Sequence, residues 1–217
     1  MAVQETVREL SLSQLPPEGP ALIELLSAAR DDGARVVLFN ATGALPEPPR
    51  LDARTLRALV LSELPLVFAF EGELSGPATD LALAADIRLC AEGASLRGPL
   101  AANARVRTLV DEAMAMDLFF GRTVLDAGRL LASGLVSAVT AAGGALAEGR
   151  RVAAVVASRG PIATQLAKEA IWRGLALPLE QALRFETDLT LLLQTTKDRA
   201  EGVRAFLEKR PPTFTGE

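Results

Sequence analysis

Short apolar runs and helical stretches alternate along the first half of the chain. Residues 35–41 (RVVLFNA) and 65–70 form continuous apolar runs, a pattern typical of strands that are covered on both faces. A third strand is predicted at residues 86–90. Helical periodicity occurs at residues 20–32 and 52–62, where a proline and an aspartate fit the helix starts. A short helix over residues 78–85 leads into the third strand.

Helical periodicity dominates from Val106 onward. Six helices are predicted, at residues 109–120, 126–132, 146–158, 162–175, 179–195 and 198–207. Strands alternate with helices first and helices follow, an order that indicates an α/β domain with a helical C-terminal part. We therefore divide the chain into an α/β core at residues 1–145 and a helical region at residues 146–217.

The amino-acid composition excludes several classes of protein. The chain has 217 residues, 49% of them hydrophobic, and 23 basic against 27 acidic side chains give a net charge of −4. No basic run is present, which argues against a nucleic-acid partner. The first twenty residues lack the apolar segment of a signal peptide, and polar residues and a proline interrupt the longest apolar stretch, residues 59–70. With a single cysteine, Cys90, we expect a cytoplasmic protein without a membrane partner.

The chain contains no histidine. This excludes Ser-His-Asp and Cys-His nucleophilic sites, histidine-ligated zinc and imidazole acid–base catalysis. Because there is no cysteine cluster either, we expect no structural metal. Any chemistry must use carboxylates, lysines, hydroxyl groups or backbone amides.

One ungapped stretch carries a family pattern. Residues 64–96 (LPLVFAFEGELSGPATDLALAADIRLCAEGASL) contain a turn glycine at Gly72, an acid at Asp80 within a helix start, and an Asp-Ile-Arg strand start at residues 86–88. Two further blocks follow in order, residues 123–139 and residues 162–216, the latter including FLEKRPPTF. Together they resemble the crotonase (enoyl-CoA hydratase/isomerase) family over about three quarters of the chain.

The resemblance implies a fold and a chemistry. The fold is the α/β ClpP/crotonase spiral of ββα units, with a helical C-terminal region that mediates trimerisation, as a trimer or a dimer of trimers. Members bind an acyl-CoA thioester, polarise its carbonyl with two backbone N–H groups, and move protons with one or two carboxylates, which makes them hydratases or isomerases (lyases). The two N–H groups stabilise the charge on the carbonyl oxygen.

The chain departs from this pattern at three catalytic positions. The second N–H donor matches Pro77, which carries no N–H. The first donor would lie in the proline-rich stretch 45–49, where Glu47 stands near the donor position. The first acid matches Asp80, and the second matches Leu100, which cannot transfer a proton. Ordinary hydratase chemistry by the family mechanism is therefore not expected.

Other charged residues enter as candidates. By resemblance, Lys209 in the tail would approach the CoA nucleotide and Arg210 would be a second phosphate contact; the alternative is a solvated pair of charges. Glu71, Glu73 and Arg97 lie near the catalytic positions in sequence and are candidates for substitute groups, or simply solvated turn residues.

We favour a crotonase homologue with lost or strongly reduced catalysis. It would bind an acyl-CoA or acyl-carrier thioester, with no other cofactor, or assist an active crotonase partner. Two alternatives stay open: a working hydratase or isomerase with Asp80 as its single acid, and a purely structural oligomer subunit. The acyl chain, the pathway and the protein partner are not encoded in any pattern we recognise.

Overall fold

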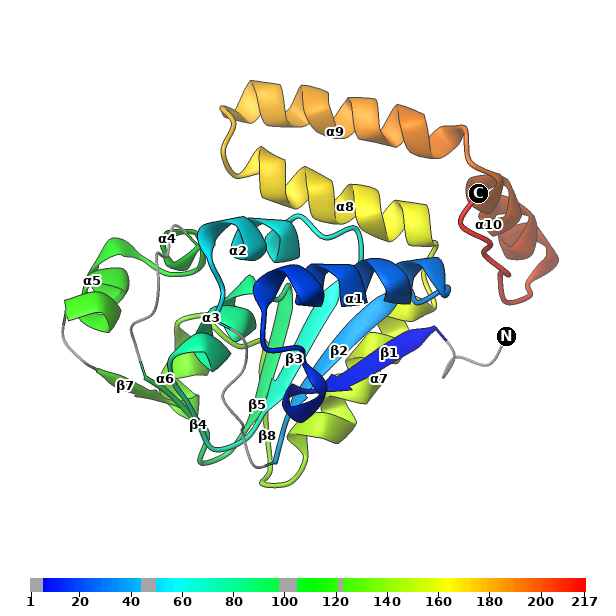
Figure 1. The fold of residues 1–217 in the computed structure, drawn as a ribbon. Helices are drawn as coiled ribbons and strands as arrows, with labels where there is room; N and C mark the ends of the chain where they lie inside the picture. The colour runs from blue at the N-terminus through cyan, green and yellow to red at the C-terminus, as the bar shows by residue number, and fades with distance from the viewer. Residues whose placement is uncertain (1–5, 44–49, 98–104, 121–122) are drawn as a thin grey trace. The chain divides into compact units, whose positions relative to one another are not determined.

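A computed structural model describes residues 6–43, 50–97, 105–120 and 123–217 (Figure 1). The chain divides into two compact units, Met1–Ala154 and Val155–Glu217. The division falls inside helix α7 (Ala145–Ala157), which begins where the sequence pattern places the end of the α/β core.

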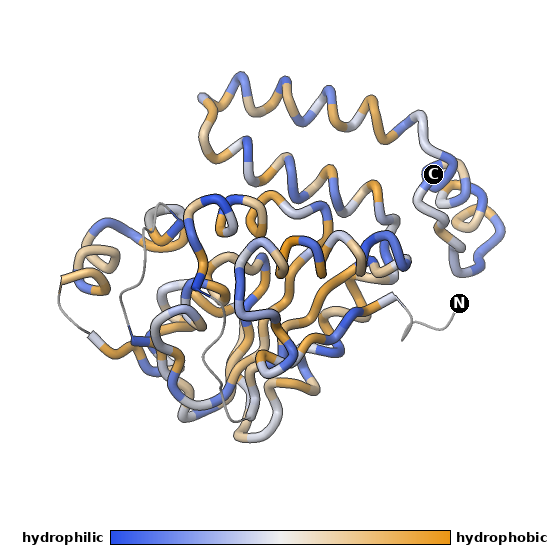
Figure 2. The backbone as a smooth tube through the Cα atoms, in the orientation of Figure 1, coloured by the Kyte–Doolittle hydropathy of each residue, from blue (hydrophilic) through white to orange (hydrophobic). Residues whose placement is uncertain are grey.

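The first unit is built on a parallel sheet. Within the described residues five strands pair in the order β1-β2-β3-β5-β8, every pair parallel. Their bounds are β1 Val7–Ser11, β2 Val36–Ala41, β3 Leu66–Phe70, β5 Ile87–Ala91 and β8 Ala138–Thr140. The central strands are buried and almost continuously apolar, as Figure 2 shows, because both faces of the sheet are covered.

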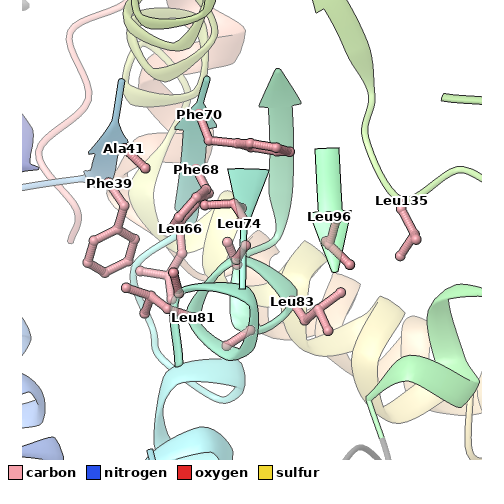
Figure 3. Packing of buried hydrophobic residues seen from close by; sticks show 14 of the residues in the cluster. Phe39, Ala41, Leu66, Phe68, Phe70, Leu74, Leu81, Leu83, Leu96 and Leu135 are labelled. Atoms are coloured by element: carbon pink, nitrogen blue, oxygen red, sulfur yellow. The ribbon is translucent and has the colours of Figure 1, made fainter. Parts of the chain in front are cut away.

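The two faces of the sheet are covered by different helices. One face presents Phe39, Leu66, Phe68 and Phe70 to a buried cluster that also takes in apolar residues of α1 (Gly19–Asp31), α2 (Ala53–Val60) and α3 (Pro77–Ala84) (Figure 3). On the other face, α7 packs against β2 and β3 through Gly149. The unit is thus a layered α/β structure in which α3 lies in the core.

A second, small sheet completes the unit. Strands β4 (Glu73–Leu74), β6 (Ser95–Arg97) and β7 (Val124–Asp126) pair in that order, with β4 and β6 parallel and β6 and β7 antiparallel. The strands β3 and β4 followed by α3 form one ββα turn of a spiral. The connecting elements are η2 (Leu12–Gln14), α4 (Val106–Leu109), α5 (Glu112–Phe120) and α6 (Ala127–Ala132).

The second unit is helical. Helices α8 (Pro161–Gly174) and α9 (Leu179–Gln194) pack against each other, and α10 (Lys197–Glu208) follows (Figure 1). The final residues return along α10, because the main-chain amides of Lys197 and Asp198 donate to Glu217 O, at 2.7 and 3.2 Å. Side chains reinforce the return: Asp198 accepts from the amides of Thr215 and Gly216 at 2.6 and 3.0 Å.

The sequence predictions of the main strands and helices are confirmed to within a few residues, with one correction. The helix expected over residues 109–120 is instead α4 and α5. Val110 between them is extended, with φ −137° and ψ 165°, and the Asp111 carboxylate accepts a hydrogen bond from Met114 N at 2.8 Å. A side-chain oxygen that accepts from an amide three residues on is an N-cap interaction, so a new helix starts here.

Five of the strands among the described residues were not predicted from the hydrophobic pattern, and one of them, β8, has three residues. β1 has the sequence VRELS, with two charged residues in five, and lies at the edge of the sheet, so it lacks the apolar run of its neighbours. β4, β6 and β7 have two or three residues each, too few for a periodicity to register.

Candidate active site

The start of α3 is where the resemblance places the second oxyanion donor. Gly76 precedes the helix with φ 56° and ψ −134°, and a φ in this range favours glycine. Pro77 is the first helical residue, and Thr79 N and Asp80 N donate to Gly76 O at 3.1 and 3.3 Å. The turn is therefore formed, but the residue at the donor position is a proline without an N–H.

Helix α3 is held rigidly by its surroundings. Every residue from Ala78 to Ala84 is buried, and Leu81 and Leu83 point into the apolar cluster with Leu74 of β4 (Figure 3). A short helix of alanine and leucine fits here because small side chains allow close approach to the sheet. The position of the first turn is consequently fixed by core packing.

Asp80 lies in this first turn with only 4% of its surface exposed. A carboxylate near a helix N-terminus is stabilised by the partial positive charge of the helix dipole. The structure therefore places Asp80, which matches the first acid of the family pattern, in the same helix turn as Pro77.

Thr79, between Ala78 and Asp80, was missed by the sequence analysis. Its side chain is completely buried, and among the described residues its hydroxyl is the one buried side-chain polar atom without a hydrogen-bond partner. An unsatisfied buried hydroxyl costs about 1–3 kcal/mol. No sequence pattern flags it, since threonine is equally common on exposed helix surfaces.

Two of the predicted catalytic positions lie outside the described residues. Leu100, at the second-acid position, falls within residues 98–104, and Glu47, near the first donor position, falls within residues 44–49. Both remain predictions from the sequence.

The three charged candidates near the site are engaged in structural contacts. Glu71 Oε1 accepts from Ala145 N at 3.3 Å, at the start of α7. Glu73 and Arg97 form a bidentate pair between β4 and β6, in which Arg97 Nε donates to Glu73 Oε1 at 3.0 Å and Arg97 Nη2 donates to Oε2 at 3.1 Å. The hydrogen bonds from Arg97 lower the pKa of Glu73, so Glu73 is ionised at neutral pH and is a poor proton donor.

The Asp-Ile-Arg motif at residues 86–88 has a structural role. Asp86 accepts from Leu66 N at 2.8 Å, which ties β5 to β3. The Arg88 guanidinium, 5% exposed, donates to Ala85 O and Leu135 O, each at 2.5 Å. Burial lowers the pKa of Arg88 to about 10, so it remains charged at neutral pH. A cation at the end of α3 also interacts favourably with the helix dipole.

Arg105 supports the same end of α3. Its Nε donates to Leu83 O at 3.1 Å. Burial, and then the nearby charge of Arg88, lower the pKa of Arg105 to about 10. Sequence analysis did not single it out, because its role depends on a fold contact across 22 residues.

The two residues expected to contact CoA lie at the end of α10. Lys209 is exposed and has φ 55°, the one non-glycine residue with positive φ among those described. Arg210 pairs bidentately with Glu201 at 2.6 and 2.9 Å and contacts Glu208 at 2.6 Å. Arg210 thus anchors the tail within its own chain, while Lys209 projects from the turn. Their contact with CoA remains a prediction.

No group of three or more acidic or cysteine side chains lies together, as a metal site would need, in the part of the chain that is described. Likewise, no helix in these ranges has the length and apolar character needed to cross a bilayer.

Comparison with known proteins settles the family. The model of the enoyl-CoA hydratase/isomerase family matches residues 49–217. The chain belongs to the enoyl-CoA hydratase/isomerase family. The match includes residues 64–96, 123–139 and 162–216, the three blocks on which the resemblance was based.

Relatives within the enoyl-CoA hydratase/isomerase family are about one third identical to the chain over the stretches that align. It is 33% identical over 162 residues to a probable mitochondrial enoyl-CoA hydratase 2 of Arabidopsis thaliana, covering 70% of this chain and 54% of that protein. It is 30% identical to a crotonyl-CoA hydratase of Syntrophomonas wolfei, covering 76% and 66%. The chain thus spans between about half and two thirds of the length of these curated relatives.

Solved structures agree over nearly the whole chain. A crystal structure of an enoyl-CoA hydratase from Polaromonas sp. JS666 has a TM-score of 0.86 at 27% identity, covering 97% of each chain. One from Bacillus anthracis gives 0.79 at 27% identity, covering 98% of this chain and 96% of that one. The predicted crotonase-type α/β fold with a helical C-terminal region is confirmed.

Proposed function

We propose that this enoyl-CoA hydratase/isomerase family protein binds an acyl-CoA or acyl-carrier thioester with lost or strongly reduced catalysis. In this role it would act as an accessory subunit, beside an active crotonase. The observation that carries the proposal is Pro77 at the first position of α3, where the family pattern requires a backbone N–H.

The energetic consequence of this one substitution is large. Removing one oxyanion donor typically lowers the rate by about 10²–10³-fold, or about 3–4 kcal/mol of transition-state stabilisation. Side-chain rearrangement cannot restore a missing main-chain N–H, and the packing of α3 leaves its first turn little room to shift. Leu100, at the second-acid position, would lower the rate further.

Thioester binding would draw on more than these groups. It relies on a complementary surface and on contacts with the CoA nucleotide, for which the exposed Lys209 is the candidate. A chain that has lost proton transfer and carbonyl polarisation would therefore still hold its ligand, and this is how we interpret the retained fold.

A second candidate function is an active hydratase or isomerase that uses Asp80 as its single acid. Two observations favour it: Asp80 is buried in the first turn of α3 beside the donor position, and the curated relatives are named as hydratases. The two functions differ in whether the unmodified protein converts substrate.

Crotonyl-CoA hydration by the purified protein tests the proposal. We expect negligible turnover for the unmodified protein, a modest rise for Pro77→Gly, and a larger rise for Pro77→Gly combined with Leu100→Glu, because an acid helps only when the thioester is polarised. Pro161→Gly is the matched control. It makes the same change at a second Gly-Pro helix start, that of α8, and should leave activity unchanged. Circular dichroism checks the fold of each variant.

Two outcomes would contradict the proposal. Robust hydration by the unmodified protein, abolished by Asp80→Asn, would establish the single-acid enzyme instead. Calorimetric titration with acetoacetyl-CoA separates binding from a purely structural role, and absence of heat at millimolar ligand would support the structural subunit.

A further inference from the structure

Helix α2 carries an unpartnered basic stripe on its outer face. Thr55 and Leu59 are buried, whereas Arg54 and Arg57 are exposed on the opposite side, and Arg50 is exposed just before the helix. We call Arg50, Arg54 and Arg57 the α2 arginine stripe. Residues three and four apart share one helix face, so at least Arg54 and Arg57 are neighbours.

None of the three arginine side chains forms an ion pair or hydrogen bond within the described residues. Asp52 is the acid next to Arg54, but its carboxylate already accepts from Thr55 N at 2.7 Å. Hydrogen bonds from Thr55, and to a smaller degree the charge of Arg54, lower the pKa of Asp52. By contrast Arg30, on the adjoining α1, is neutralised by Asp31 and Glu63. Residues 50–57 thus carry three arginines against one acid, Asp52, a local excess of positive charge on a chain with a net charge of −4.

A small groove of mixed character lies next to this helix. It has a volume of about 140 Å³, and its walls combine apolar side chains such as Leu26 of α1 and Ala58 of α2 with the ion pair of Arg30 and Glu63. Leu61, at the end of α2, is 51% exposed. Pockets for ligands of drug size or larger have volumes of about 300–1,000 Å³, so the groove is too small for a whole coenzyme but suits one protein side chain.

These features fit a protein better than a small molecule. The stripe lies on the convex outside of a helix, whereas small ligands bind in concave sites. Apolar anchors beside charged rims are the ordinary anatomy of a protein interface. The charge complementary to the stripe is a row of carboxylates, such as an acidic helix presents.

We infer that the α2 arginine stripe is the docking surface for an acidic carrier protein that presents the acyl group as a phosphopantetheine thioester. The inference rests on the proposed function. Of the two thioester forms named there, acyl-CoA and acyl-carrier, it selects the acyl-carrier form. Helix α2 packs against α3, whose first turn holds Pro77 and Asp80, so a carrier bound on α2 sits on the helix adjoining the candidate site (Figure 1).

The test compares two forms of one thioester. Affinities for crotonyl-CoA and for a bacterial acyl carrier protein loaded with crotonyl-phosphopantetheine are measured with the full chain at low and high salt. The variant is Arg54→Glu with Arg57→Glu. Its control is Arg8→Glu with Arg159→Glu, which reverses two other exposed arginines that have no ion pair within the described residues. Circular dichroism confirms that α2 folds in the variant.

We expect the carrier to bind the unmodified protein in a salt-dependent way. Reversing the stripe should weaken carrier binding by about tenfold or more, because like charges then face each other across the interface. Crotonyl-CoA affinity should change by less than about twofold, and the control should change neither. The neutral variant Arg54→Gln with Arg57→Gln should lie between.

Three results would overturn the inference. One is carrier binding that is insensitive to charge reversal, and another is an equal loss for both ligands, which would assign the stripe to the phosphates they share. A third is crotonyl-CoA binding without carrier binding, which leaves the proposed function standing. If neither thioester binds, the proposed function fails as well.

Discussion

Gly149 of α7 lies directly against Ala69 of β3. A Cβ atom built on Gly149 would be 2.9 Å from the Ala69 Cβ and 3.1 Å from Leu38 Cδ1, closer than side-chain atoms normally approach. The helix therefore rests on the sheet without an intervening side chain. On this face α7 also contributes alanines, of which Ala145 and Ala153 are completely buried.

We expect Gly149→Ala to destabilise the protein by about 1–3 kcal/mol, the usual cost of overpacking a close contact. Gly202→Ala in α10 is the control, because there the new Cβ would lie 3.7 Å from Phe214, an ordinary contact. That change should be neutral or stabilise by up to about 1 kcal/mol through helix propensity. Urea unfolding measures both, and equal effects would contradict the close approach.

Arg88→Lys should destabilise the first unit by about 2–4 kcal/mol. A lysine keeps the charge but cannot span Ala85 O and Leu135 O with a planar fork, so a buried carbonyl loses its partner. Arg151→Lys, at an exposed pair with Glu148, should change stability by less than about 0.5 kcal/mol. Thermal unfolding followed by calorimetry distinguishes the two, and a tolerated Arg88→Lys would show that the main-chain contacts matter little.

Lys209→Gly should raise stability while weakening thioester binding. A lysine with φ 55° costs about 1 kcal/mol relative to glycine, so the free energy of unfolding should increase by about that amount. If Lys209 contacts the CoA nucleotide, acetoacetyl-CoA affinity should fall at the same time. Arg204→Gly, which removes a charge within α10, should lower stability and leave affinity unchanged. Stabilisation without loss of affinity would remove Lys209 from the proposed site.

Lowering the pH should release the C-terminal residues that follow α10 from their contact with Glu201, over a defined pH range. The hydrogen bonds from Arg210, and then that from Thr213 N, lower the pKa of Glu201 from 4.5 to about 2. A carboxylate whose pKa is lowered on folding stabilises the native state above its unfolded pKa, and that stabilisation is lost as the pH falls through the folded value. The protection factor of the Thr213 amide against hydrogen exchange should therefore fall between about pH 4.5 and about 2. Glu201→Gln should remove this dependence, whereas Glu208→Gln should largely retain it.

The protein should be an oligomer, which we propose is a trimer or a dimer of trimers. Large apolar side chains of α9 are exposed in the single chain, among them Leu179 at 74% and Leu183 at 53%. Exposed apolar surface of this extent is typical of interfaces. Light scattering should return a multiple of 22.9 kDa. Leu179→Arg with Leu183→Arg should dissociate the assembly and Leu61→Arg should not; a monomeric unmodified protein at micromolar concentration would contradict the claim.

The sequence predicted the central architecture because the decisive signals are local. The runs before Ala41 and Phe70 are apolar over a whole strand, and Asp52 caps α2 as its position suggested. The edge strand and the short strands were not predicted, because their stability comes from pairing partners that are distant in sequence. The break between α4 and α5 at Val110 was not predicted, because a single extended residue does not disturb the helical periodicity of the sequence.

The candidate site could be predicted at positions where the residue type itself decides whether a group can take part in the family's chemistry. The resemblance to the family pattern placed Pro77 at a donor position, which stays a prediction, and the structure adds that Pro77 is the first residue of α3 in a packed core. The unpaired hydroxyl of Thr79 and the carbonyl contacts of Arg88 and Arg105 were not predictable, because each depends on which groups the fold brings together.

Because Cys90 is buried, its thiol is unreactive in the native state. It is fully enclosed in β5, and burial raises its pKa to about 11, so little thiolate exists at neutral pH and reagents do not reach it. Because the chain has no other cysteine, a fluorophore attached to a cysteine introduced on the surface would report on that position alone. The same thiol becomes available to an alkylating reagent only when β5 opens, so its labelling rate reports the population of the opened sheet, or the opening rate itself when the reagent reacts faster than β5 recloses.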